Sequence, residues 1–366
     1  MTRLPFLDWM RGLAVVVMIQ CHVFNSLTRL DQRNSAVYIF TQFVGGMAAP
    51  LFLFMAGMTT GFLMDRLEQR GATPLRRWMA ALRRAGYILL IAYLFRLSNA
   101  VFGLPKPNIT DLLKVDILNC MGLAMAFFSL AAFWDSARRV RFTIAGAVLV
   151  ASLAPIVSSL DWSGVPAVLR YYAVPGPDRA QFPFFPCAAY LGFGAAAGSL
   201  VKAAGDAKSR SHMDSLMRWL VLAGMGILIA AEYFGNLPFS VYAASDFWRN
   251  SPALIFIRLG IMLVTLTGAY LWTEYLAGQG WSWMRSLGKT SLLVYWVHVM
   301  LVYGVTAAPL KRTLTPAGSA LAALTVLLLM IALAELRLRY RSSASSPPRE
   351  KDPRVPKTRA TASEAA

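Results

Sequence analysis

The chain is poor in the residues on which metal sites and disulfide frameworks depend. Its 366 residues include only three histidines and three cysteines. The cysteines are Cys21, Cys120 and Cys187, and they show no CxxC spacing. We therefore expect them to be small packing residues rather than disulfide or metal ligands. No grouping of histidines with carboxylates suggests a bound metal, and none is expected.

Long polar stretches are also scarce, whereas long apolar stretches are abundant. Hydrophobic residues make up 57% of the chain, which is more than soluble proteins contain. About ten apolar runs approach the roughly 20 residues that span a bilayer core. They cover residues 11–28, 41–64, 85–103, 117–134, 142–160, 184–203, 218–236, 253–275, 290–309 and 318–337. The sequence thus predicts an all-α polytopic membrane protein of about ten transmembrane helices, in one domain over residues 1–340.

Acidic residues are outnumbered two to one, with 18 acidic against 36 basic residues and a net charge of +18. The distribution of the arginines favours membrane topology over nucleic-acid binding as the reason. Basic residues gather in alternate loops, near 65–84, 138–141 and 202–218, and again in the C-terminal tail. The positive-inside rule then predicts that both termini lie in the cytosol. The Ser-, Pro- and charge-rich residues 341–366 are predicted to form a disordered basic tail.

Ionisable side chains inside the predicted spans are the unusual feature, because they are costly in a bilayer. Arg96, Glu232 and Glu274 lie near span ends, where snorkelling is the simplest interpretation. His22 and His298 have no long aliphatic stem and cannot snorkel. We therefore interpret these two histidines as facing the interior of the helix bundle.

The first span carries a polar stripe. His22 follows Arg11 by eleven residues, which is about three helical turns, so the two side chains share one helix face. Asp8 precedes Arg11 by three residues on the same stripe and could orient its guanidinium. With a cytosolic N-terminus, Arg11 lies at the inner mouth and His22 about 16 Å deeper. Such a stripe could line a path across the membrane.

Tyr295 and His298 form a second polar pair in a late span. Ser291, Tyr295 and His298 are spaced at i, i+4 and i+7 and therefore share a face. His298 is expected at a middle depth, in a helix that runs in the same direction as the first. An imidazole that merely bonds to a neighbouring helix remains the alternative.

The 65–84 segment holds more arginine than topology requires. Arg76, Arg77, Arg83 and Arg84 form pairs seven residues apart, which predicts one basic face on an interfacial helix. Guanidinium groups bind phosphates in bidentate fashion. The partner could be an anionic lipid surface or a soluble phosphate-bearing donor, and both interpretations stay open.

Three stretches resemble a known family. "LDWMRGLAVVVMIQCH", with Arg11 and His22, is similar to the first helix of membrane-bound acyltransferase family 3. "APLFLFMAGMTTGFLM" before an Arg-rich loop and "SLLVYWVHVMLVYG", with Tyr295 and His298, resemble two later parts of that family.

The chain also resembles the related heparan-α-glucosaminide N-acetyltransferase superfamily. "APLFLFMAGMT", "ILNCMGLA" and "FPFFPCAAYLGFGAAAGSL" carry that similarity. The heparan enzymes place a catalytic histidine in the first outer loop, and residues 29–42 contain none. This difference favours His22 as the functional histidine and the family 3 arrangement over the heparan one.

These resemblances imply transfer of an acyl group, expected to be acetyl, from cytosolic acyl-CoA. The acceptor would be a glycan, or another hydroxyl or amino compound, at the outer face of a bacterial inner membrane. His22 would act as the base or carry the acyl group, with Arg11 and Asp8 at the donor mouth. His298 and Tyr295 would orient the acceptor or stabilise the oxyanion. Arg76, Arg77, Arg83 and Arg84 would hold the donor phosphates.

Two other classes of function fit the same residues. In a transporter or permease, the His/Arg stripe would carry a substrate or protons without chemical turnover. In a non-catalytic membrane partner, the histidines would only pack.

Overall fold

The computed structural model describes residues 4–102, 112–176, 181–207, 209–239, 241–277 and 280–345. Throughout these ranges the regular elements are helices, and β-pairing is limited to isolated bridges. The all-α prediction is therefore confirmed. The long helices are α1 (Pro5–Leu27), α3 (Ala48–Gln69), α4 (Pro74–Phe102), α6 (Ser136–Ser159), α8 (Phe184–Asp206), α9 (Arg210–Gly235), α10 (Pro252–Leu271) and α13 (Pro316–Ser345).

Shorter helices connect or complete the long ones. They are α2 (Ala36–Gly45), α5 (Ile117–Phe128), α7 (Ala167–Ala173), α11 (Trp283–Lys289) and α12 (Ser291–Tyr303), with single turns η1 (Leu30–Gln32), η3 (Ser129–Phe133), η4 (Trp272–Leu276) and η5 (Val305–Leu310). Local sequence sets several of the boundaries. Asp135 caps α6 by accepting from the Arg138 amide, and Asp116 with Asn119 forms a capping box at α5.

Eight helical segments of the described chain are long and apolar enough to cross a membrane. The other two of the ten predicted spans are shorter apolar helices, over Ile117–Phe133 and Ser291–Tyr303. The second is short because the helix stops before Gly304 and a 3-10 turn containing Pro309 follows. The apolar composition predicted both segments, but only the turn geometry shows that they are not full-length spans. The cytosolic position of the termini stays a prediction.

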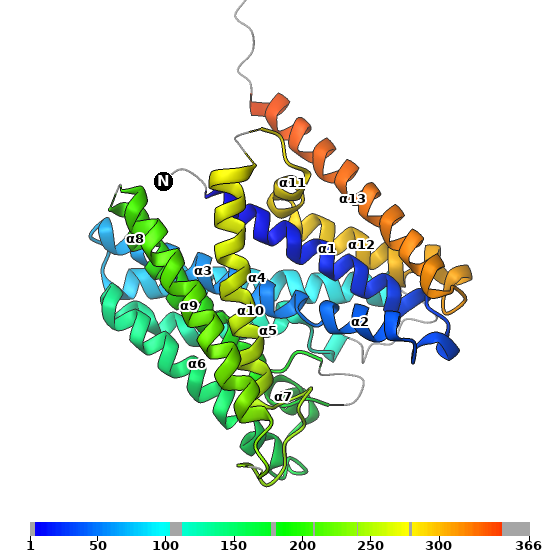
Figure 1. Cartoon of the computed structure of the whole chain (residues 1–366), viewed down its shortest axis with the longest axis horizontal. Coiled ribbons are helices and arrows are strands. Elements are labelled where there is room, and N and C mark those ends of the chain that lie inside the picture. The colour runs from blue at the N-terminus through cyan, green and yellow to red at the C-terminus, as the bar shows by residue number, and fades with distance from the viewer. Residues whose placement is uncertain are drawn as a thin grey trace, which may run out of the picture.

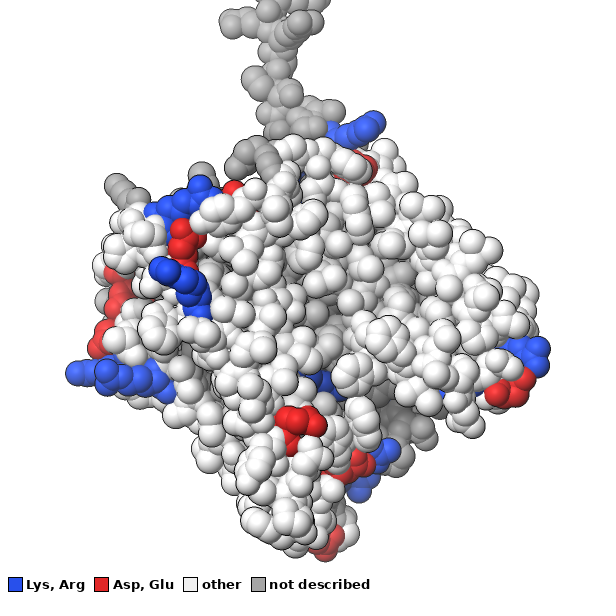
Figure 2. Space-filling view, viewed as in Figure 1, with Lys and Arg blue, Asp and Glu red and all other residues white. Residues whose placement is uncertain are grey.

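The helices form a bundle in which α1 lies against α11, α12 and α13 and also contacts α3 and α10 (Figure 1). Helix α8 packs on α3, and helix α9 packs on α10. On the face drawn in Figure 2, a broad area of uncharged atoms occupies the middle, and most charged side chains lie at its margins. This distribution is typical of a surface that contacts lipid. Residues 346–366 of the predicted tail lie outside the described residues, and α13 continues to Ser345.

The glycine of the Arg11-Gly12 pair has a packing role. Helix α11 crosses the start of α1 so closely that a methyl group on Gly12 would overlap the carbonyl of Met284. A methyl group on Gly288 would likewise overlap the carbonyl of Asp8. Small residues let helix backbones approach in this way. The contact fixes where α12 begins relative to α1.

Candidate active site

The centre of the site is a direct contact between two histidines that are 276 residues apart in sequence. Nδ1 of His22 lies 2.9 Å from Nε2 of His298. Helices α1 and α12 run in the same direction, because Gly288 meets Asp8 at one end and Ser26 donates to the Val302 carbonyl (2.9 Å) at the other. The parallel direction of the two helices is as the sequence predicted, whereas the direct contact between the two imidazoles was not predicted.

The two rings differ in their surroundings. His298 is fully buried, and its Nδ1 lies 2.7 Å from the carbonyl oxygen of Val294. His22 is only half-buried, with the ring of Tyr303 edge-on to it at 5.5 Å between centroids. Because Nδ1 of His22 is engaged with His298, the remaining ring nitrogen of His22 is Nε2. The pair therefore has one buried member and one that is partly exposed.

Tyr295 lies on the His298 face but reaches a different partner. Its hydroxyl donates to Oδ2 of Asp116 (3.3 Å), and Arg96 Nη2 is 3.0 Å from the same oxygen. Arg96 and Asp116 are 16% and 15% exposed, so Arg96 does not snorkel as expected but forms a sheltered ion pair. An acidic partner, one helix further along the chain, removes the need to reach solvent.

Asp116 belongs to a polar cluster that the sequence interpretation missed. Its neighbour Asn119 donates to the Tyr172 hydroxyl (3.0 Å), which also bonds to the hydroxyl of Tyr93 (2.7 Å). Burial, together with the bond to Tyr93, raises the pKa of Tyr172, so this phenol stays protonated. The Asp-x-x-Asn pattern before an apolar run was a capping signal that could have identified the start of α5. We call Tyr93, Arg96, Asp116, Asn119, Tyr172 and Tyr295 the polar cluster.

Asp8 and Arg11 interact at the beginning of α1, at 3.6 Å between Oδ1 and Nη1. Asp8 is buried and Arg11 is 23% exposed. Between Arg11 and His22 on this face, Val15 and Met18 are packed in the core. The stripe therefore has polar ends and an apolar middle. The packed side chains of Val15 and Met18 separate Arg11 from His22 in this structure.

The four predicted donor arginines do not share one face of α4. Arg76 and Arg83 are exposed and line a surface hollow of about 330 Å³ together with Leu67, Thr73, Leu75, Met79 and Ala80. Arg77 is buried, 2.9 Å from Oε2 of Glu68. Arg84 donates to the carbonyl and the hydroxyl of Thr59 (3.2 and 2.7 Å). Only one of the two arginine pairs is thus placed to meet a soluble phosphate.

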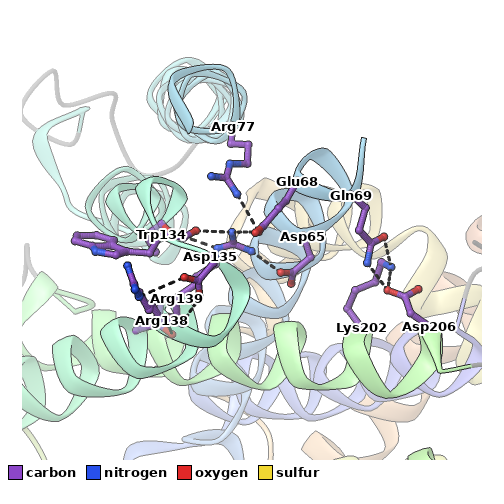
Figure 3. A network of polar contacts seen from close by, with 12 residues as sticks. Asp65, Glu68, Gln69, Arg77, Trp134, Asp135, Arg138, Arg139, Lys202 and Asp206 are labelled. Atoms are coloured by element: carbon purple, nitrogen blue, oxygen red, sulfur yellow. Dashed lines mark hydrogen bonds and ion pairs between the residues drawn. The ribbon is translucent and has the colours of Figure 1, made fainter. Parts of the chain in front are cut away.

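Arg77 is part of an ionic network at the end of α3 (Figure 3). Arg139, 1% exposed, binds Asp65 and Glu68, so Glu68 lies between Arg77 and Arg139. Arg139 also donates to the Trp134 carbonyl (2.9 Å). The network joins α3, α4 and the start of α6. In the described residues, no group of three or more His, Cys, Asp or Glu side chains could hold a metal.

A family model described as heparan-alpha-glucosaminide N-acetyltransferase, catalytic, matches residues 3–238. The chain belongs to this family. It is a membrane acetyltransferase, and acetyl-CoA is the donor that such enzymes use in general. Of the two resemblances seen in the sequence, the match falls on the heparan one rather than on acyltransferase family 3. The matched region of this heparan-type acetyltransferase includes His22 but ends before His298. Among curated proteins, no relative matches the chain.

Proposed function

We propose that this protein transfers an acetyl group from cytosolic acetyl-CoA to a hydroxyl or amino group of a glycan at the outer face of a bacterial inner membrane. The contact between His22 and His298 carries the proposal, because it orients a partly exposed imidazole inside a membrane acetyltransferase. An acceptor hydroxyl is a weak nucleophile at neutral pH, and a histidine is the usual base for it.

In the proposed step, Nε2 of His22 takes the acceptor proton while the acceptor oxygen attacks the thioester carbonyl carbon. The carbonyl electrons move onto oxygen and give a tetrahedral intermediate. When this collapses, the carbon–sulfur bond breaks, and the CoA thiolate takes the proton from the His22 imidazolium. The products are the acetylated acceptor and CoA, and His22 returns to its starting form.

The donor phosphates are assigned to the hollow beside Arg76 and Arg83. These side chains are exposed at the beginning of α4, where predicted topology puts the cytosol. Arg11 lies close enough to Arg84 for their charges to interact, so positive charge continues from this surface toward α1. Because Val15 and Met18 close the stripe, a neighbouring helix must move before the thioester can reach His22.

The acceptor side is assigned to the polar cluster. Its hydroxyl, amide and charged groups are the kinds that hydrogen-bond to sugar hydroxyls, and Tyr172 comes from α7, in a predicted outer segment. Tyr295 connects the cluster to His298, because their rings lie 6.0 Å apart between centroids.

The test is release of free CoA thiol from acetyl-CoA by the purified protein in nanodiscs, with His22→Gln beside it. His212→Gln is the matched control, because His212 is exposed on α9 and far from the site in sequence. We expect turnover in the wild type and the control, and a loss of about 100-fold or more in His22→Gln. Absence of turnover with acetyl-CoA and longer acyl-CoA donors would reject the proposal in favour of a transporter. Acetyl label retained on His22 would replace the direct step by an acetyl-histidine route.

A further inference from the structure

The two hydrogen bonds of His298 determine which nitrogen of His22 carries the proton. A carbonyl oxygen can only accept, so the 2.7 Å contact with Val294 requires a proton on Nδ1 of His298. In a neutral ring, Nε2 of His298 is then an acceptor. The 2.9 Å contact with His22 can form only if Nδ1 of His22 donates. Nε2 of His22 is left with a free lone pair.

The ring geometry supports a true in-plane hydrogen bond between the imidazoles. Their planes differ by 9° and their centroids are 5.1 Å apart. That separation is close to the 2.9 Å nitrogen–nitrogen distance plus two ring radii. Such a sum arises only when the line between the nitrogens runs nearly through both centroids. The lone pair of one ring therefore points at the N–H of the other.

The surroundings favour neutral rings. The partners that the structure gives them are each other, the Val294 carbonyl and the rings of Tyr295 and Tyr303. None of these is a carboxylate, and His298 has no solvent-exposed surface. A charge placed on His298 would be neither paired nor hydrated, which is costly. The neutral pair with the proton order described above is the consistent assignment.

We propose that His298 is a positioning residue that holds His22 in the tautomer with the proton on Nδ1 and the lone pair on Nε2. This deepens the proposed function, because that tautomer lets Nε2 accept a proton at once. Free histidine prefers the opposite tautomer, with the proton on Nε2. When His22 becomes an imidazolium during the reaction, its Nδ1–H still donates to His298 and the cation is stabilised. In catalytic triads a carboxylate orients the base in this way; here a second imidazole, fixed by a backbone carbonyl, has that position.

The test is the nitrogen spectrum of protein labelled with ¹⁵N in histidine, since protonated and unprotonated imidazole nitrogens have well-separated chemical shifts. Only three histidines are present, so the His22→Gln and His212→Gln variants assign the signals. We expect a proton on Nδ1 of His22 and none on Nε2. A proton on Nε2 of His22 in the intact protein would overturn the proposal.

Two substitutions at position 298 separate positioning from packing. His298→Gln places an amide oxygen near the site of Nε2 and can still accept from His22. His298→Leu fills similar space without an acceptor. We expect the glutamine variant to keep the His22 tautomer and activity within about tenfold. The leucine variant should move the proton toward Nε2 and lose about 100-fold in kcat/KM. An unchanged His22 tautomer in His298→Leu would also overturn the proposal, and if that variant fails to fold, the wild-type spectrum decides alone.

The spectrum does not depend on acetyl-CoA, so the two proposals can fail separately. The expected tautomer without thioester turnover would reject the proposed reaction and keep the assignment of His298. Turnover together with a proton on Nε2 of His22 would keep the proposed reaction and reject the assignment of His298.

Discussion

Arg77 Nη1 lies 2.9 Å from Glu68 Oε2, although its sequence neighbour Arg76 is exposed at the surface hollow. Neighbours in a helix point about 100° apart, so two adjacent arginines can have opposite roles. Arg77, together with Glu68, belongs to the protein interior, and Arg76 is available to a ligand.

This division gives a prediction for donor binding. Replacing both Arg76 and Arg83 by glutamine should raise the KM for acetyl-CoA about tenfold and leave kcat nearly unchanged, because phosphate contacts contribute to binding before and during the reaction. Steady-state kinetics in nanodiscs provides the measurement. Arg66→Gln is the control, since Arg66 is exposed on α3 and does not line the hollow. An equal effect in the control would show that only the general positive charge matters.

Arg139 should be important for stability. It is 1% exposed and bound to Asp65 and Glu68, so Arg139→Met leaves buried carboxylate charge without its partner. A broken buried pair costs about 3–5 kcal/mol in the free energy of unfolding. Thermal unfolding in detergent should show a clearly lower midpoint than the wild type. Arg138→Met is matched to it, because Arg138 is 72% exposed, and the prediction is wrong if the two variants unfold alike.

The crossing of α11 over α1 predicts that Gly12 does not tolerate a side chain. Gly12→Ala should push Met284 and α11 away, which displaces α12 and lowers both the yield of folded protein and its turnover. Gly86→Ala is the comparison, because no atom lies within 4 Å of the added methyl. Alanine is the better helix former there by about 0.5–1 kcal/mol. Size-exclusion profiles and activity of both variants test this, and a fully active Gly12→Ala protein would contradict the described crossing.

Asp116 is predicted to hold the polar cluster together. Asp116→Ala removes the helix cap of α5 and the partner of Arg96 at once, for an expected loss of about 3 kcal/mol in the free energy of unfolding. Its neighbour Tyr295 also loses its acceptor, so turnover should fall. Asp161→Ala, at an exposed loop position, should change neither quantity. Unfolding and turnover that match the wild type in Asp116→Ala would refute this role.

Much of the fold was readable from composition and periodicity. The apolar runs located the helices, and helical spacing put Arg11 and His22 on one face. The parallel direction of α1 and α12 followed from counting spans. The positions of the helices and the shared face depend on local sequence, and a helix of 3.6 residues per turn converts spacing directly into direction.

The rest depended on contacts between distant segments. Spacing placed His298 on a face with Tyr295, but not against His22, 276 residues away. Arg96 looked like a snorkelling residue because its partner Asp116 lies in another helix. The arginines of α4 appeared to form one face because spacing by seven aligns each pair but does not show which pair faces the protein. Packing against α3 and α6 decides which arginines of α4 are buried, and the local sequence pattern does not predict that packing.

The central claim is that an acetyl group passes from one side of the membrane to the other by way of His22. Inverted inner-membrane vesicles from cells producing the protein expose the cytosolic face, and radiolabelled acetyl-CoA is supplied outside them. We predict that label appears on glycan enclosed within the vesicles, and that His22→Gln abolishes this label whereas His212→Gln does not. Enclosed label that is equal in wild type and His22→Gln, or absent from both while acetyl-CoA stays intact, would contradict the account.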